Sequence, residues 1–226
     1  MIRALAAVTL MVLSCAAGTL EDARDAQDKP ALERLAQEAL AKASSKASDA
    51  SLWHHAALSY SYLAEVALEV RDKGAARSAA EAGIKAAEKA VSLNGSSSEY
   101  HRILGTLCGQ VIPANVLAGL RWGRCALDEV NRAIQLDGKS AMAYLSRGVG
   151  NYYLPESFGG GAEVAIKDLR KALELNPKLP EGHLWLGIAL RKAGKNAEAR
   201  ASLLRALALN PKRVWAKQQL EKTPAQ

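Results

Sequence analysis

The fold is decided by residues 177–211, which read PKLPEGHLWLGIALRKAGKNAEARASLLRALALNP. Pro177 and Pro211 stand 34 residues apart, and small or apolar residues recur between them in a fixed order. These positions are Gly187, Gly194, Ala199, Leu203 and Ala206. Small residues at this spacing let two antiparallel helices approach closely, and proline opens each connection because it cannot continue the preceding helix. The stretch therefore predicts one helix hairpin.

The order of these residues resembles the tetratricopeptide repeat, a helix-turn-helix unit of this length. The same skeleton recurs upstream, with a growing interval between the small residue of the first helix and that of the second. The interval is 12 residues in the last unit (Gly187 to Ala199), then 17 (from Gly148), 21 (from Gly105) and 26 (from Ala57). We therefore predict repeat units at about 50–97, 98–140, 141–179 and 180–213, with hairpins that lengthen toward the N-terminus.

Composition supports an all-helical chain. The sequence holds 44 alanines but only 5% aromatic residues, and alanine favours helices over pleated sheets. We predict an all-α fold, a right-handed α-solenoid of antiparallel hairpins, as a single domain over residues 31–226. Residues 31–43 should add a helix that closes the first unit, and residues 214–222 a capping helix. Residues 18–30 are interpreted as a linker.

A second resemblance concerns the third hairpin. Tyr152-Tyr153-Leu154-Pro155 followed by Gly159-Gly160-Gly161 is similar to a loop in a group of exported bacterial tetratricopeptide proteins. This resemblance implies a fold and a compartment but no active site. A more remote likeness, to the T-component lipoproteins of tripartite transporters, implies a chain that encloses a small ligand.

The N-terminus has the pattern of a targeting segment. Arg3 precedes an apolar run, Ala4 to Leu13, that is too short to span a bilayer as a helix. Residues 1–17 are therefore predicted to be a secretory signal. Cys15 then becomes an acylated N-terminus, or cleavage follows Ala17. Either route exports the chain, so we expect a periplasmic protein anchored by lipid, with a soluble periplasmic or secreted protein as the alternative.

Export changes how the remaining cysteines are interpreted. Cys108 and Cys125 fall on the two helices of the second hairpin, and their antiparallel register brings them near one another. In an oxidising compartment we expect a disulfide, with two buried free thiols as the alternative.

The net charge of +7 is local and does not indicate nucleic acid. Residues 160–226 contain 13 Lys/Arg and 6 Asp/Glu, without aromatic or Gly/Arg-rich interleaving.

The sequence shows no catalytic constellation, cofactor motif or metal-ligand spacing. His54 and His55 are adjacent, so on a helix they point in different directions and cannot bind one metal together. The triple glycine lacks a Gly-Lys-Ser/Thr ending, so it predicts a loop with left-handed backbone. We expect no enzyme activity.

Function is therefore expected in the concave groove, lined by the first helix of each hairpin. The candidate groove residues are Tyr62, Arg102, Leu145, Tyr152, Tyr153, Leu184, Arg191 and Lys192. The tyrosines and Leu145 would anchor a peptide or helix, and the basic pair would meet an acidic group. One of the adjacent Tyr152 and Tyr153 should face the groove while the other packs under Phe158. The alternative is a carrier of a small hydrophobic or aromatic ligand, closed in by the long helices.

Overall fold

The computed structural model describes residues 19–114 and 116–225, and within them the regular structure is helical, without strands. The elements, in chain order, are α1 (Leu20–Asp25), α2 (Lys29–Ser45), α3 (Ala50–Glu69), α4 (Lys73–Leu93), α5 (Ser98–Val111), the 3-10 turn η1 (Ile112–Ala114), α6 (Val116–Leu136), α7 (Ala141–Tyr153), η2 (Glu156–Phe158), α8 (Ala162–Leu175), α9 (Pro180–Lys192), α10 (Asn196–Leu209) and α11 (Val214–Glu221). The expected all-α repeat fold is confirmed.

Most helices begin at a residue that caps their free backbone N–H groups. Asp49 caps α3, Asp72 caps α4, Ser97 caps α5 and Ser140 caps α7, each through a side-chain oxygen that accepts from an N–H in the first turn. α9 begins instead with Pro180, whose missing N–H costs nothing at a helix start. Local sequence thus sets the boundaries of the hairpins.

Each of the last three hairpins closes through one glycine. A Cβ placed on Gly105, Gly148 or Gly187 would lie 3.1, 3.3 and 3.0 Å from the carbonyl oxygen of Ala126, Ala165 and Ala199. It would also press on a core side chain, for example Leu203 at 2.6 Å from Gly187. The helices therefore touch backbone to backbone at an equivalent point in each unit, as the repeat skeleton predicts.

The first helices of the hairpins form a continuous inner layer, since α3 contacts α5, α5 contacts α7 and α7 contacts α9. α3 and α4 have 20 and 21 residues, whereas α9 and α10 have 13 and 14. The hairpins therefore lengthen toward the N-terminus. Among the described residues no helix is both long and apolar enough to cross a membrane.

The interpretation of residues 18–30 as a linker is wrong. Thr19 caps α1 in a reciprocal arrangement with Asp22, and Leu20 and Ala23 are buried in the core shared with α2 and α3. Gln27, at φ 56°, makes the turn into α2. α1 is only 6 residues long, which is too short for a hydrophobic period to appear in the sequence.

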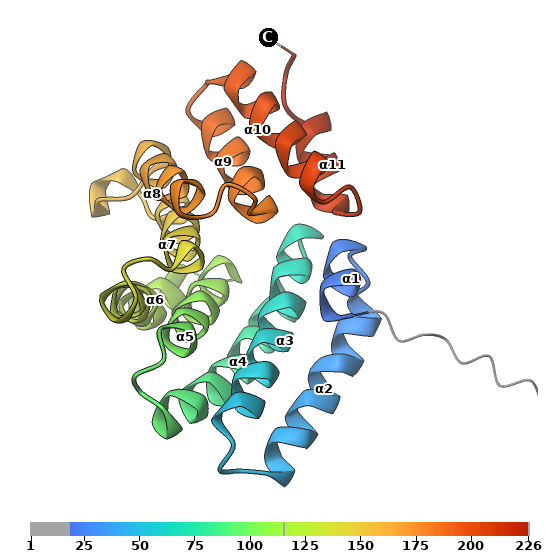
Figure 1. Cartoon of the computed structure of the whole chain (residues 1–226), viewed down its shortest axis with the longest axis vertical. Coiled ribbons are helices and arrows are strands. Elements are labelled where there is room, and N and C mark those ends of the chain that lie inside the picture. The colour runs from blue at the N-terminus through green and yellow to red at the C-terminus, as the bar shows by residue number, and fades with distance from the viewer. Residues whose placement is uncertain (1–18, 115, 226) are drawn as a thin grey trace, which may run out of the picture.

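The chain curls so that its two ends meet. Figure 1 shows α1 beside α11, and the C-terminal end of α3 directed toward α9 and α11. Lys212, just before α11, forms an ion pair with Asp22 of α1 at 3.1 Å, across 190 positions of sequence. The inner layer is thus closed on one side by contacts between the first and last elements.

Candidate interaction surface

Arg213 holds the two ends together. Its side chain is 1% exposed, and it donates from Nε to Glu181 Oε1 of α9 at 3.0 Å and from Nη2 to Glu65 Oε1 of α3 at 2.7 Å. It also pairs with Glu69 of α3 and donates to the carbonyl oxygen of Arg24 at 3.3 Å. One guanidinium therefore links α1, α3 and α9 to the start of α11.

Helix α1 completes this junction with a second arginine. Arg24 pairs with Asp25 at 2.7 Å and with Glu181 at 3.3 Å, and its guanidinium lies 4.8 Å from the centre of the Tyr62 ring. Asp25 accepts a hydrogen bond from Asn210 at 2.6 Å. We call the six charged residues the seam; they are Arg24, Asp25, Glu65, Glu69, Glu181 and Arg213.

The seam holds more negative than positive groups, with four carboxylates against two guanidinium groups. Burial, which outweighs the attraction of Arg213, raises the pKa of Glu69 to about 7 and also raises the pKa of Glu65. Glu181 is 9% exposed, and its buried Oε2 has no hydrogen-bond partner. Closing the seam therefore places excess acid in a region with little water.

Several of the expected groove residues are core or junction residues. Leu145 and Leu184 are 6% and 0% exposed and pack inside the hairpin layer. Arg102 is 5% exposed, paired with Glu99 and hydrogen-bonded to Ser146. These side chains connect neighbouring hairpins, so they are not available to a partner.

The basic pair of α9 is also occupied. Arg191 donates to the carbonyl oxygen of Gln219 at 3.0 Å and to Oγ1 of Thr223 at 3.1 Å, which fixes the end of the chain. Lys192 donates to the carbonyl oxygen of Tyr152 at 2.7 Å and lies 4.4 Å from the centre of its ring. Arg191 is therefore not free to bind an acidic group of a partner. Of this pair, only the exposed Lys192 is accessible to one.

Four aromatic rings meet beside the seam. The Tyr152 and Tyr153 rings lie 5.0 Å apart edge to face, each is about 6 Å from Trp185 (5.9 and 6.0 Å), and Trp185 lies 5.1 Å from Trp215. Arg213 lies 5.7 Å from the Trp215 ring. We call Tyr152, Tyr153, Trp185 and Trp215 the aromatic shelf, which joins α7, α9 and α11.

The expectation that the two tyrosines serve different faces is wrong, because both rings contact Trp185. Tyr153 is nevertheless 55% exposed, whereas Trp185 and Trp215 are buried. The pKa of its phenol is raised to about 12, first by the crowded surroundings and then by Tyr152 and the seam carboxylates Glu69 and Glu65. Tyr153 thus presents a supported ring close to the acidic seam.

The loop after α7 also differs from expectation. Phe158 is 76% exposed and does not plug the loop onto the helices. The left-handed backbone is present, at φ 84° for Gly159 and 102° for Gly161, and a Cβ on Gly160 would lie 2.3 Å from the carbonyl oxygen of Leu154. The triple glycine therefore allows the chain to turn back tightly against Leu154, where a side chain would not fit.

Cys108 and Cys125 form a disulfide in the structure, with Cα atoms 6.0 Å apart. It joins α5 to α6 near Gly105, where these helices already touch. Cys15, the candidate lipidation site, lies outside the described residues.

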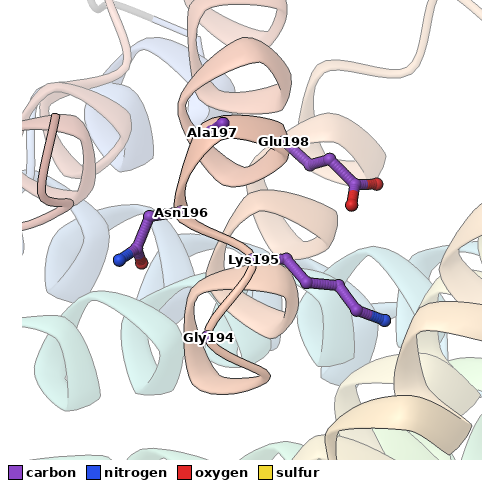
Figure 2. A pocket seen from close by; sticks show the side chains of 5 residues that line it. All are labelled: Gly194, Lys195, Asn196, Ala197 and Glu198. Atoms are coloured by element: carbon purple, nitrogen blue, oxygen red, sulfur yellow. The ribbon is translucent and has the colours of Figure 1, made fainter. Parts of the chain in front are cut away.

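Two hollows of the described surface lie at turns between consecutive helices. One, of about 310 Å³, is lined by residues 194–198 at the turn between α9 and α10, and the other lies between α1 and α2. Figure 2 shows Lys195 and Glu198 pointing to one side of this turn and Asn196 to the other, around a shallow and open surface. In the part of the chain described here, no group of His, Cys, Asp or Glu is placed to hold a metal. These hollows give no support to a closed ligand carrier.

Hairpins with equivalent glycine contacts and a continuous inner layer define a helical-repeat protein. Residues 180–213 match the tetratricopeptide repeat family. The chain shares its fold with a thermophilic TPR protein from Thermus thermophilus, at 17% identity and a TM-score of 0.55, over 84% of this chain and 97% of that chain. Residues 180–213 therefore form a tetratricopeptide repeat, and the described chain has the fold of tetratricopeptide repeat proteins.

Two further solved structures are similar at lower scores. YrrB, a TPR protein with an unusual peptide-binding site, has 16% identity and a TM-score of 0.46, over 91% of this chain and 100% of that chain. The TPR domain of Arabidopsis OM64 has 23% identity and a TM-score of 0.40, over 52% of this chain and 95% of that chain. A comparison of the sequence with curated proteins gives no match.

Proposed function

We propose that this chain is a non-enzymatic protein-interaction scaffold of the bacterial cell envelope, and that it holds an extended segment or helix of a protein partner on its inner surface. Tetratricopeptide folds work by such binding. The observation that carries the proposal is Tyr153, which is 55% exposed although its ring rests against Tyr152 and Trp185. A rigid aromatic ring that is supported beneath and free above is typical of an interface anchor.

The site we propose is smaller than the one expected from the sequence. It centres on Tyr153, with the partly buried Tyr152 and the exposed Lys192 at its edge. Tyr62 lies under Arg24, and the other candidates are core or junction residues. The partner therefore meets the inner surface at the aromatic shelf rather than along the whole groove.

A pull-down by crosslinking from the native envelope tests this site. Proteins captured by the wild type should be lost with Tyr153→Ala, because removing an anchor costs about 1 to 3 kcal/mol of binding. Phe158→Ala is the matched control, since Phe158 is an exposed aromatic residue on the adjoining loop that lies outside the shelf. Equal capture by the wild type and both variants would exclude the shelf as the binding surface.

The envelope location rests on the targeting pattern of residues 1–17 and is supported by the disulfide, since such bonds persist in oxidising compartments. Intact-mass analysis of protein from the native membrane should show loss of residues 1–14 and a lipid adduct on Cys15. A product that begins at Gly18 without lipid would favour the soluble alternative instead.

A further inference from the structure

We propose that the seam is a proton-dependent latch, which holds the ends of the solenoid together at mildly acidic pH and releases α1 from α9 and α11 as the pH rises. The proposal goes beyond the binding function and does not depend on it. It rests on an interface made of buried charges that do not balance.

The seam is the contact through which α1 and α3 meet α9 and the start of α11, and Arg213 lies at its centre with 1% of its side chain exposed. Glu69 and Asp25 are also buried, at 2% and 9% side-chain exposure. In the open state all of these groups would regain water.

Arg213 and Arg24 can each balance one carboxylate, so two of the four seam carboxylates lack a compensating charge. A buried carboxylate without a partner takes up a proton rather than remain ionised. Closure of the seam is therefore coupled to proton uptake, and opening to proton release.

The groups around the seam supply no free positive charge that would balance its excess carboxylates. The neighbouring titratable and polar groups are Glu21 before the seam residues of α1, Gln27 in the turn after it, Tyr62 on α3, Arg102 on α5, Tyr153 on α7, Asn210 after α10 and Gln218 on α11. Arg102, the one cation among them, is already paired with Glu99 at 2.5 Å. Its charge is therefore not free to balance the seam.

The direction of the pH dependence follows from Glu69. Its pKa is about 7 in the closed seam, raised by burial, and about 4.5 for the ordinary group. The closed state therefore binds more protons than the open state between about pH 4.5 and 7. Each unit of pH across this window shifts the equilibrium toward opening by up to about tenfold per proton.

Hydrogen exchange of the full chain tests the latch. The protection of the α1 amides, corrected for intrinsic exchange, should fall by at least tenfold between pH 5 and pH 8, while protection of α10 stays constant. Glu69→Gln removes the titrating group and keeps an acceptor for Arg213, so it should flatten this dependence. Glu65→Gln should do the same if the proton is shared between the two carboxylates of α3.

Glu163→Gln is the matched control, because Glu163 is an exposed carboxylate paired with Lys195 far from the seam, and it should keep the wild-type slope. Three results would overturn the proposal. They are constant protection of α1 in the wild type, an unchanged slope in both Glu69→Gln and Glu65→Gln, and a parallel loss of protection in α10, which would show global unfolding.

Discussion

The last hairpin and the seam hold the same helix, α9, by opposite means. Toward α10 the contact is apolar and small, with Gly187 against Leu203 and the carbonyl oxygen of Ala199. Toward α1 and α3 the contact is ionic, with Glu181 bound to Arg213 and Arg24. The first kind of contact recurs in each of the last three hairpins, whereas the second joins the first and last elements of the described chain.

This difference determines how each region responds to change. A close apolar contact tolerates neither added volume nor lost volume, but it does not depend on pH. A buried ionic contact stabilises only while its charges match, because the cost of removing ions from water offsets most of their attraction. The hairpins therefore supply the stability of the fold, and the seam supplies a junction that conditions can adjust.

The largest effect is expected from Arg213→Ala. Removing this guanidinium leaves the buried Glu69 and Glu181 and the partly buried Glu65 without their main partner, which should lower the free energy of unfolding by about 4 kcal/mol. Urea denaturation at pH 7 measures this loss. Arg205→Ala, on the exposed face of α10, should change stability by less than about 0.5 kcal/mol. A loss from Arg213→Ala as small as that of the control would contradict the ionic account.

Reduction of the disulfide should have the next largest effect. Cys108 and Cys125 close a loop with a sequence separation of 17, so the bond should contribute about 3 kcal/mol. The melting temperature should fall on reduction and fall equally in Cys108→Ser. Titration of thiols in unfolded, unreduced protein should find neither cysteine free, and two free thiols would reject the bond.

A smaller effect is expected from Gly187→Ala. The added Cβ would lie 2.6 Å from Leu203 and 3.0 Å from the backbone of Ala199, so the hairpin must open slightly, at a cost of about 2 kcal/mol. Gly150→Ala is the matched control on α7, where a Cβ meets nothing within 4 Å. That substitution should stabilise the protein by about 0.5 to 1 kcal/mol through helix propensity. Effects of the same sign at both glycines would show that close packing is not the reason for glycine at position 187.

Sequence reasoning predicted the hairpins well because their signal is periodic. Gly187 and Ala199 identify one unit, and the same pair of positions locates the other units even where the helices are longer. The register of α5 against α6, which places Gly105 opposite Ala126, also follows from this pattern. Local spacing is sufficient wherever a contact repeats along the chain.

The seam could not be predicted in this way, because its members are far apart in the sequence. Arg213 lies 144 positions from Glu69 and 189 positions from Arg24. One signal was present: Glu65 and Glu69 place two acids one turn apart on a helix that is otherwise mostly apolar. Their partner could not be chosen from the sequence, because Arg213 follows its Asn-Pro turn as an ordinary basic residue. For the same reason the sequence predicted too many groove residues, because it could not show that Arg102 and Arg191 are paired within the chain.

A double-mutant cycle on Arg213 and Glu69 tests the central claim, that the two ends of the solenoid are joined by a buried ionic contact. The free energy of unfolding is measured for the wild type, Arg213→Met, Glu69→Met and the double variant. Because the partners lie on α3 and at the start of α11, any coupling reports on the junction itself. We predict that the two losses are not additive, with a coupling of about 2 kcal/mol; losses that add to within about 0.5 kcal/mol would contradict a buried ionic junction.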